Sequence, residues 1–338
     1  MKLKEIQLER NAITNWKEYV KRPARDDDYD TLLTESCRLM EGEKLIGVYI
    51  VLPKTKETET LREIVKRIDY TKNRRTSGLT TTSKVFGYLP REIIRKDYCS
   101  SADLATKNAK YHAFICKFGE TLTENYKESC PEMFEYHESI TKDKIKPEWT
   151  INNTPYTSGI INKNNQLNYH WDRGNYKKVF SNMVAFRDKV EGGHLAIPEY
   201  NIGLEIADLS LTFFAGQEVL HGVTPFHTNQ GGYRYTLVYY TMNQMWKCED
   251  VSTEVARIRQ RKTTREKNRL LRQQGKLSED DDPVGGLRKK VKDPKKFKNY
   301  NLFAELGIDR KYLGVPFTKL PKYIQEKLVH YEQKERKE

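Results

Sequence analysis

Two histidines and one aspartate in a single β-rich stretch constrain this chain more than any other feature. His170 and Asp172 form a His-x-Asp pair, and His221 follows 51 residues after the first histidine. Alternate residues of a strand face the same side, so both members of the pair can reach one metal ion. Two imidazoles and one carboxylate are the ligand set that holds non-haem Fe(II) and leaves coordination positions open. We therefore expect an iron centre whose first two ligands sit late in one strand and whose third comes from a strand that folds back beside it.

The stretch that holds these residues, 157–243, has the pattern of a β-rich core. Turn residues separate short apolar segments at a spacing of about 8–12 residues, which is typical of a sandwich or barrel. The expected strands are SGIIN, QLNYHWD, SNMVAFRD, HLAIP, YNIGLEI, SLTFFA, the run QEVL before His221, and RYTLVYYTM, with KVEGG as a turn. Eight or so antiparallel strands closing as two sheets predict a double-stranded β-helix, the jelly-roll form.

The residues before this core predict a mixed support region. EKLIGVYIVL (43–52) is a continuous apolar run of strand type, and 57–69 places apolar residues at helical spacing. Segment 74–99 is expected as an ordered loop with a short strand, and 101–139 as two helices broken around Gly119. The predicted fold class is therefore α+β with a mainly β core. Its expected parts are an N-terminal α/β support region (1–150), the catalytic core (151–248) and a basic helical C-terminal extension (249–338).

Positive charge is concentrated in that extension. Residues 251–338 hold 24 Lys and Arg against 13 Asp and Glu, which accounts for +11 of the net charge of +13. We expect a basic helix over 251–275, capped by Asp250 or Ser252 and ended by Gly275, then a linker (277–286) and a small helical unit. Such asymmetry favours a polyanionic partner, nucleic acid being the commonest, although a solvated helical tail explains the charge equally well.

The cysteines and the hydropathy predict an intracellular, soluble protein. The five cysteines are scattered, odd in number and without CxxC spacing, which predicts a reducing compartment with neither a disulfide framework nor a zinc knuckle. Mean hydropathy is −0.81, and no run approaches the roughly 18 apolar residues of a membrane span. The first residues, MKLKEIQLER, lack the apolar segment of a secretory signal. We therefore expect no membrane association.

Several short motifs carry a family resemblance. They are TSGIINKN (157–164), HWDRGN (170–175), EGGHLAIPEY (191–200), HGVTP (221–225) and GYRYTLVYY (232–240), preceded by FGYLPR and RKDYC within 86–99. Together they resemble the 2-oxoglutarate/Fe(II) dioxygenases, and within them the TET/JBP group that oxidises 5-methylpyrimidines in nucleic acid. The phage-type branch is the most similar, so the resemblance places the protein in a host cytoplasm if it is phage-derived. The likeness covers roughly residues 75–245.

The resemblance assigns roles to the residues of the motifs. It implies that His170, Asp172 and His221 bind Fe(II) and that Arg234 holds the distal carboxylate of the co-substrate 2-oxoglutarate. A planar, permanently charged guanidinium suits that task. Thr236, two residues further on the same strand face, would add a hydroxyl to that carboxylate. Decarboxylation to succinate would then accompany the use of O2 to hydroxylate a methyl group.

The substrate is less constrained than the metal. The resemblance implies DNA that carries 5-methylpyrimidines, with 5-methylcytosine converted to 5-hydroxymethylcytosine. Such a base must reach the iron by flipping or in a single strand. Polar candidates for contacting it lie near the motifs, whereas Trp171 alternates with the two ligands and is expected to pack, and His194 is expected to be structural. The candidates are Asn162, Asn164 and Arg173, together with Arg91 and Arg95 for phosphate contacts, which a solvated loop would explain equally well.

Three functions remain open from the sequence. The first is a DNA 5-methylcytosine dioxygenase, with thymine in DNA as the close variant. The second is a 2-oxoglutarate hydroxylase of a protein or small molecule. The third is an inactive jelly roll that binds nucleic acid, and the intact ligand set argues against it.

Overall fold

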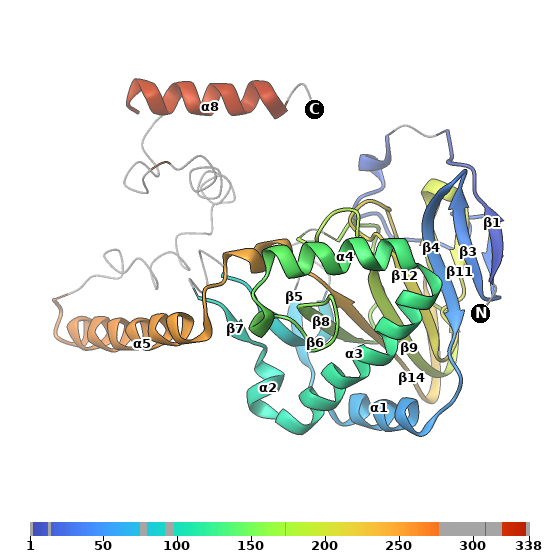
Figure 1. Cartoon of the computed structure of the whole chain (residues 1–338), viewed down its shortest axis with the longest axis horizontal. Coiled ribbons are helices and arrows are strands. Elements are labelled where there is room, and N and C mark those ends of the chain that lie inside the picture. The colour runs from blue at the N-terminus through green and yellow to red at the C-terminus, as the bar shows by residue number, and fades with distance from the viewer. Residues whose placement is uncertain are drawn as a thin grey trace. The chain divides into compact units, whose positions relative to one another are not determined.

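The computed structural model describes residues 3–12, 15–74, 80–91, 98–172, 174–276, 308 and 320–335. The chain divides into two units, which are described separately. The first comprises Met1–Glu92 with Lys96–Arg257, and the second comprises Ile93–Arg95 with Ile258–Glu338. The boundary falls within one helix, α5 (Val251–Gln273), and Figure 1 shows the elements in chain order.

A large sheet and a small sheet form the core of the first unit. The large sheet has the order β1-β3-β4-β12-β9-β14-β8-β6-β5, with β7 paired to β6, and the small one has the order β13-β10-β11-β2. Most neighbours are antiparallel, and β1–β3 and β11–β2 are parallel. This mixed, mostly sheet architecture is consistent with the double-stranded β-helix expected from the sequence. The strands of the large sheet are β1 (Lys4–Gln7), β3 (Cys37–Glu41), β4 (Lys44–Val51), β5 (Thr71–Arg74), β6 (Thr80–Leu89), β7 (Ser100–Ser101), β8 (Ser158–Lys163), β9 (Ser181–Gly192), β12 (Ser210–Phe214) and β14 (Phe226–Tyr240). Those of the small sheet are β2 (Thr31–Leu33), β10 (Leu195–Ile197), β11 (Ile202–Leu204) and β13 (Gly222–Val223).

The longest strand, β14, has one face in the hydrophobic core, and its other face carries Arg234 and Thr236. Tyr235, Leu237 and Tyr239 are buried in the main hydrophobic cluster, which also includes helix residues. The alternate residues therefore point to the opposite face of the sheet. β14 pairs with β9 from Phe226↔Gly192 to Tyr239↔Asn182, with a register shift between Thr228 and Tyr233. Because β9 continues through Gly192, most of the segment expected as the turn KVEGG belongs to a strand.

Helices cover the core face of this sheet. They are α1 (Lys56–Arg67), α2 (Asp103–Lys107), α3 (Ala109–Ser129) and α4 (Pro131–Lys144), and Figure 1 shows α3 and α4 in front of the strands. A capping box between Thr55 and Thr58 starts α1, and its Leu61 and Val65 are fully buried. Short 3-10 helices lie at Trp16–Glu18, Pro147–Trp149, Pro198–Tyr200 and Asn243–Lys247.

Helix α3 runs straight through Gly119, so the predicted break at this glycine is wrong. A Cβ at Gly119 would lie 3.3 Å from a ring carbon of Tyr239, and the Tyr239 hydroxyl donates to the Ile115 carbonyl at 2.8 Å. The glycine therefore permits close packing of helix and strand. The helical chain breaks instead where α3 ends at Ser129 and α4 begins at Pro131.

Three other expectations about local structure are also corrected. The segment QLNYHWD is not a strand, because β8 ends at Lys163 and His170 makes only an isolated bridge with His221. QEVL forms a turn rather than a strand. The segment 74–99, expected as an ordered loop with a short strand, contains the ten-residue strand β6 between β8 and β5.

A disulfide joins Cys99 to Cys248, with Cα atoms 5.7 Å apart. The expectation that no cysteines are paired is therefore wrong for these two. The partners lie 149 residues apart in the sequence, and neither belongs to a recognisable spacing pattern. Cys37, Cys116 and Cys130 are free thiols.

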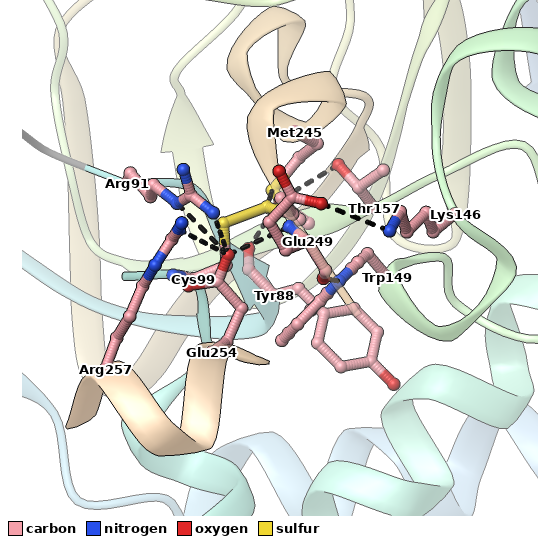
Figure 2. Close-up of a disulfide and its surroundings, with 12 residues drawn as sticks. Tyr88, Arg91, Cys99, Lys146, Trp149, Thr157, Met245, Glu249, Glu254 and Arg257 are labelled. Atoms are coloured by element: carbon pink, nitrogen blue, oxygen red, sulfur yellow. Dashed lines mark hydrogen bonds and ion pairs between the residues drawn. A yellow bond between two sulfur atoms is a disulfide. The ribbon is translucent and has the colours of Figure 1, made fainter. Parts of the chain in front are cut away.

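The disulfide lies beside an ion-pair network at the start of α5, shown in Figure 2. Glu254 is 1% exposed and accepts from the backbone amides of Cys99 and Glu249, each at 2.9 Å. The guanidinium of Arg91 also donates to it. The Trp149 indole donates to the Glu249 carbonyl at 2.6 Å. The first turn of α5 is thus fixed to Arg91, which follows β6, and to the segment that begins at residue 98.

Helix α5 begins and ends near the residues expected from the sequence. The Thr253 amide donates to Asp250 at 2.9 Å, and Gly275 has a φ of 67°. A second helix in this part of the chain is α8 (Lys322–Glu335). The expected linker (277–286) lies outside the described residues. Within the described part of the chain, no helix has the length and apolar character needed to cross a membrane.

Candidate active site

His170, Asp172 and His221 meet at one point beside the large sheet. His170 and Asp172 lie in the segment after β8, and His221 immediately precedes β13. Their ligand atoms lie within 4.8 Å of one another. Asp172 Oδ1 is 3.7 Å from His170 Nε2 and 4.0 Å from His221 Nε2. The arrangement places three donor atoms around one point, as a metal ion would require.

Main-chain hydrogen bonds hold these three residues together. The His170 amide donates to the His221 carbonyl at 2.9 Å, and the His221 amide donates back at 3.2 Å. The Asp172 amide donates to the Gly216 carbonyl at 2.8 Å. A Cβ at Gly216 would lie 2.4 Å from Asp172 Oδ2, so only glycine leaves room for this carboxylate.

The orientation of both imidazoles is also fixed. His170 Nδ1 lies 2.8 Å from the Asn168 carbonyl, and His221 Nδ1 lies 2.9 Å from the Val219 carbonyl. A carbonyl can only accept, so each Nδ1 carries a hydrogen, and in the neutral imidazole Nε2 is then the atom with a lone pair for a metal ion. Hydrogen bonds of this kind from the second ring nitrogen are the usual support of a metal-binding histidine.

The three residues line a cavity of about 820 Å³. Alternate residues of β14 form one wall, from Arg234 through Thr236 and Val238 to Tyr240. Asn162 of β8 and Met183 of β9 continue this wall. The volume falls within the usual range of small-molecule sites.

Arg234 lines this cavity, is buried, and has no acidic partner among the described residues. Its side chain is 2% exposed, one terminal nitrogen donates to the Gly193 carbonyl at 3.4 Å, and Nε has no hydrogen-bond partner among the described residues. Burial, with repulsion from Arg187, lowers the pKa of Arg234 to about 10. A buried, incompletely paired guanidinium is costly unless an anion compensates it. The cavity therefore fits a ligand with a carboxylate.

The other predicted polar residues, in β8 and just after it, differ in position. Asn162 lines the cavity and donates to Thr236 Oγ1 at 3.4 Å. Asn164 is exposed, and its Oδ1 accepts from the Arg234 amide at 2.8 Å, so it supports the strand rather than the cavity. Asn165, which the sequence analysis did not identify, lines the cavity and bonds to Asn162. No signal in the sequence distinguished these asparagines.

The remaining candidates are not part of the His-Asp-His cluster or lie outside the described residues. Arg91 is paired with Glu254 (Figure 2), which gives it a structural role in place of a free phosphate contact. Trp171 lines the cavity and packs against the cluster that contains Tyr169. His194 is half-buried, and desolvation lowers its pKa. Arg95 and Arg173 lie outside the described residues.

The N-terminal segment forms part of the cavity, which the sequence analysis missed. Lys17, Val20 and Lys21 line the cavity. The Lys21 amide donates to the Tyr169 carbonyl at 2.9 Å, and Asn168 Nδ2 donates to the Lys21 carbonyl at 2.7 Å. This segment lies outside every motif, so only its position in the fold reveals the contact.

Comparisons with known proteins agree with this site. Residues 91–243 match the oxygenase domain of the 2OGFeDO superfamily, the Tet_JBP family. The bifunctional helicase and thymine dioxygenase JBP2 of Trypanosoma brucei brucei (strain 927/4 GUTat10.1) is 26% identical over 154 residues, which are 44% of this chain and 13% of that protein. The structure of NgTET1 in complex with 5mC DNA shares the fold, with a TM-score of 0.50 and 16% identity over 68% of this chain and 90% of that chain.

The fold, the His-Asp-His cluster and the matched region define a domain of the 2-oxoglutarate/Fe(II) oxygenase class. Within that class, residues 91–243 are similar to the TET/JBP family. The predicted resemblance to the TET/JBP family is therefore confirmed, while placement in the phage-type branch stays a prediction. The curated relative is much longer than this chain, which matches 13% of its length.

Proposed function

We propose that this protein is a 2-oxoglutarate- and Fe(II)-dependent dioxygenase that oxidises the methyl group of 5-methylcytosine in DNA to 5-hydroxymethylcytosine. The proposal rests on one cavity that is lined both by residues able to bind a metal ion and by a residue able to bind a carboxylate. A His-Asp-His cluster lines this cavity, and so does the buried Arg234, which has no acidic partner among the described residues. A metal site and a carboxylate site in one cavity are what this reaction requires.

His170, Asp172 and His221 would hold the iron, and Arg234 with Thr236 would hold the distal carboxylate of 2-oxoglutarate. When bound, Fe(II) supplies the activation of O2. The Nδ1 bonds of both histidines to backbone carbonyls leave Nε2 of each neutral imidazole as the atom that would bind the metal, and Arg234 would orient the co-substrate. The apolar side chains of Val238, Met183 and Met242 on the cavity wall would limit the access of water.

The substrate is proposed from chemistry shared by two relatives. One relative is named a thymine dioxygenase, and the other was solved with DNA containing 5-methylcytosine. Both bases carry a methyl group at position 5 and differ at position 4, where cytosine has an amino donor and thymine a carbonyl acceptor. Thymine in DNA is therefore the close alternative substrate. Asn162 lines the cavity and is the polar candidate for a contact with the base.

Helix α5 supplies a surface suited to a phosphate backbone. Arg259, Lys262, Arg265, Arg269 and Arg272 are exposed and recur every three or four residues, so they share one face of the helix. A stripe of this kind attracts a polyanion without reading its sequence. It favours DNA over a protein or small-molecule substrate, which is the second candidate function.

The rate of succinate formation from 2-oxoglutarate tests the proposal against that second candidate. With Fe(II) and O2 present, we expect a duplex carrying 5-methylcytosine to raise the rate above that with the same duplex unmethylated. Turnover that no DNA stimulates, and that a peptide or small molecule does, would favour the second candidate instead.

A further inference from the structure

A series of side-chain hydrogen bonds leads from the backbone of β6 to Thr236 on the cavity wall. The Thr82 amide donates to Asn165 Oδ1 at 2.8 Å, and Asn165 Nδ2 donates to the Thr82 carbonyl at 3.0 Å. Asn165 Nδ2 also donates to Asn162 Oδ1 at 3.0 Å. Asn162 Nδ2 in turn donates to Thr236 Oγ1 at 3.4 Å.

The direction of every bond in this series is determined by its first member. A backbone amide can only donate and a carbonyl can only accept, so the Thr82 backbone fixes which end of the Asn165 amide is oxygen. Asn165 therefore donates an N–H to Asn162, and the side-chain oxygen of Asn162 accepts it. The Asn162 nitrogen then faces Thr236, whose hydroxyl oxygen accepts.

The consequence lies in the remaining hydrogen of Thr236. Because its oxygen already accepts from Asn162, the hydroxyl hydrogen is available to donate elsewhere, and Thr236 lines the cavity two residues from Arg234. Thr236, Asn162 and Asn165 are each 5% exposed or less. The guanidinium of Arg234 has donors only. This end of the cavity therefore presents hydrogen-bond donors to a ligand.

We propose that Asn162 and Asn165 are positioning residues that hold Thr236 as a hydrogen-bond donor and so make this end of the cavity selective for a carboxylate. A carboxylate accepts from every donor, whereas a carboxamide of the same shape brings N–H groups that oppose them. The inference rests on the proposed function in taking that carboxylate to be the distal group of 2-oxoglutarate.

Calorimetric binding to the full chain, loaded with Mn(II) and kept free of O2, tests the inference without turnover. The probes are 2-oxoglutarate and 2-oxoglutaramate, in which the distal carboxylate is an amide. Asn162→Leu removes the donor to Thr236 without adding charge. We expect it to lower the preference for 2-oxoglutarate about tenfold, the effect of one hydrogen bond to a charged group.

A double-mutant comparison with Thr236→Val shows whether Asn162 acts through Thr236 or through the stability of the protein as a whole. If Asn162 acts through Thr236, then Asn162→Leu should change the preference less than about twofold once the hydroxyl is absent. Thr236→Ser, which keeps the hydroxyl, should retain the wild-type preference. An equal effect of Asn162→Leu in both backgrounds, or no effect in either, would overturn the proposal.

Neighbouring asparagines provide a matched pair should Asn162→Leu fail to fold. Asn165→Asp can no longer donate to Asn162 and should lower the preference. Asn164→Asp adds the same charge at an exposed position and keeps the oxygen that accepts from the Arg234 amide, so the preference should stay unchanged. Equal effects of Asn165→Asp and Asn164→Asp on the preference would contradict the proposed role of this series of hydrogen bonds. A wild-type protein that binds neither probe would overturn the proposed co-substrate as well, which distinguishes the two failures.

Discussion

The backbones of His170 and His221 pair directly with each other, N–H to C=O in both directions, at 2.9 and 3.2 Å. Residues 51 apart in the sequence thus present their imidazoles side by side, with ring centres 4.4 Å apart. Main-chain hydrogen bonds therefore bring these residues together, and their side chains form the candidate metal site. Changes that leave the main chain intact should alter metal binding more than folding.

The first prediction concerns the space behind Asp172. Gly216→Ala should displace the carboxylate, because the added Cβ would lie 2.4 Å from Oδ2. We expect Mn(II) affinity to fall at least about tenfold, as it does when the support of a metal ligand is disturbed. Calorimetric titration checks this. Gly231→Ala is the control, since its Cβ meets nothing within 4 Å but its φ of +76° is strained. It should lower stability and leave the affinity unchanged, and equal affinities in both variants would contradict the account.

The second prediction concerns Arg234. Arg234→Met should raise the concentration of 2-oxoglutarate needed for half-maximal succinate formation by about a hundredfold or more, because a buried carboxylate would lose its charged partner. Arg234→Lys keeps the positive charge but loses the planar guanidinium. The concentration of 2-oxoglutarate that it requires should lie between those of the wild-type protein and Arg234→Met. An unchanged requirement in the methionine variant would remove Arg234 from the co-substrate site.

The third prediction is a pH dependence of stability that arises from His137. Complete burial lowers the pKa of His137 from 6.5 to about 3. Its Nε2 bonds to the Thr241 hydroxyl at 2.8 Å, while Nδ1 has no partner among the described residues. The unfolded chain takes up a proton below pH 6.5 and the native chain does not. The free energy of unfolding should therefore fall by about 1.4 kcal/mol per pH unit between pH 6.5 and 3 from this group.

Urea denaturation between pH 7.5 and 5 measures this slope. His137→Gln removes the titrating group and should flatten the curve by that amount, whatever its effect on stability at pH 7.5. Parallel curves for the wild-type protein and the variant would show that His137 is not responsible.

The fourth prediction concerns the basic stripe of α5. Changing Arg259, Lys262 and Arg265 together to Gln should weaken duplex binding and reduce the slope of log affinity against log salt concentration by up to about 0.9 per lost phosphate contact. Fluorescence anisotropy over a salt series checks this. A matched triple change at exposed lysines of α3 and α4 (Lys110, Lys142 and Lys144) should leave the slope unaltered. Equal slopes in all three proteins would remove α5 from the DNA surface.

The sequence was most informative where local pattern and tertiary contact agree. Strand β4 and helix α1 lie within two residues of their expected ends, because their apolar periodicity is the same pattern that packing requires. The set of His170, Asp172 and His221 was also predicted, since its residue types have few other combined uses.

The features that the sequence did not reveal depend on distant partners. The role of Gly119 is set by Tyr239, and Cys99 is paired with a residue 149 positions away. His170 was expected in a strand, whereas a two-residue bridge suffices to hold it. Asn165 became interpretable only through its contacts with Thr82 and Asn162. Local sequence carries no record of such contacts.

The most direct test is mass spectrometry of nucleosides from DNA treated with the protein, Fe(II), 2-oxoglutarate and O2. Two duplexes serve as substrates: one with 5-methylcytosine and with uracil in place of thymine, the other with thymine and unmethylated cytosine. We predict 5-hydroxymethylcytosine from the first duplex with the wild-type protein, and none with His221→Ala, which removes a proposed metal ligand. Oxidised thymine from the second duplex alone would select the alternative substrate. No oxidised pyrimidine from either duplex, in a protein that converts 2-oxoglutarate to succinate, would contradict the account.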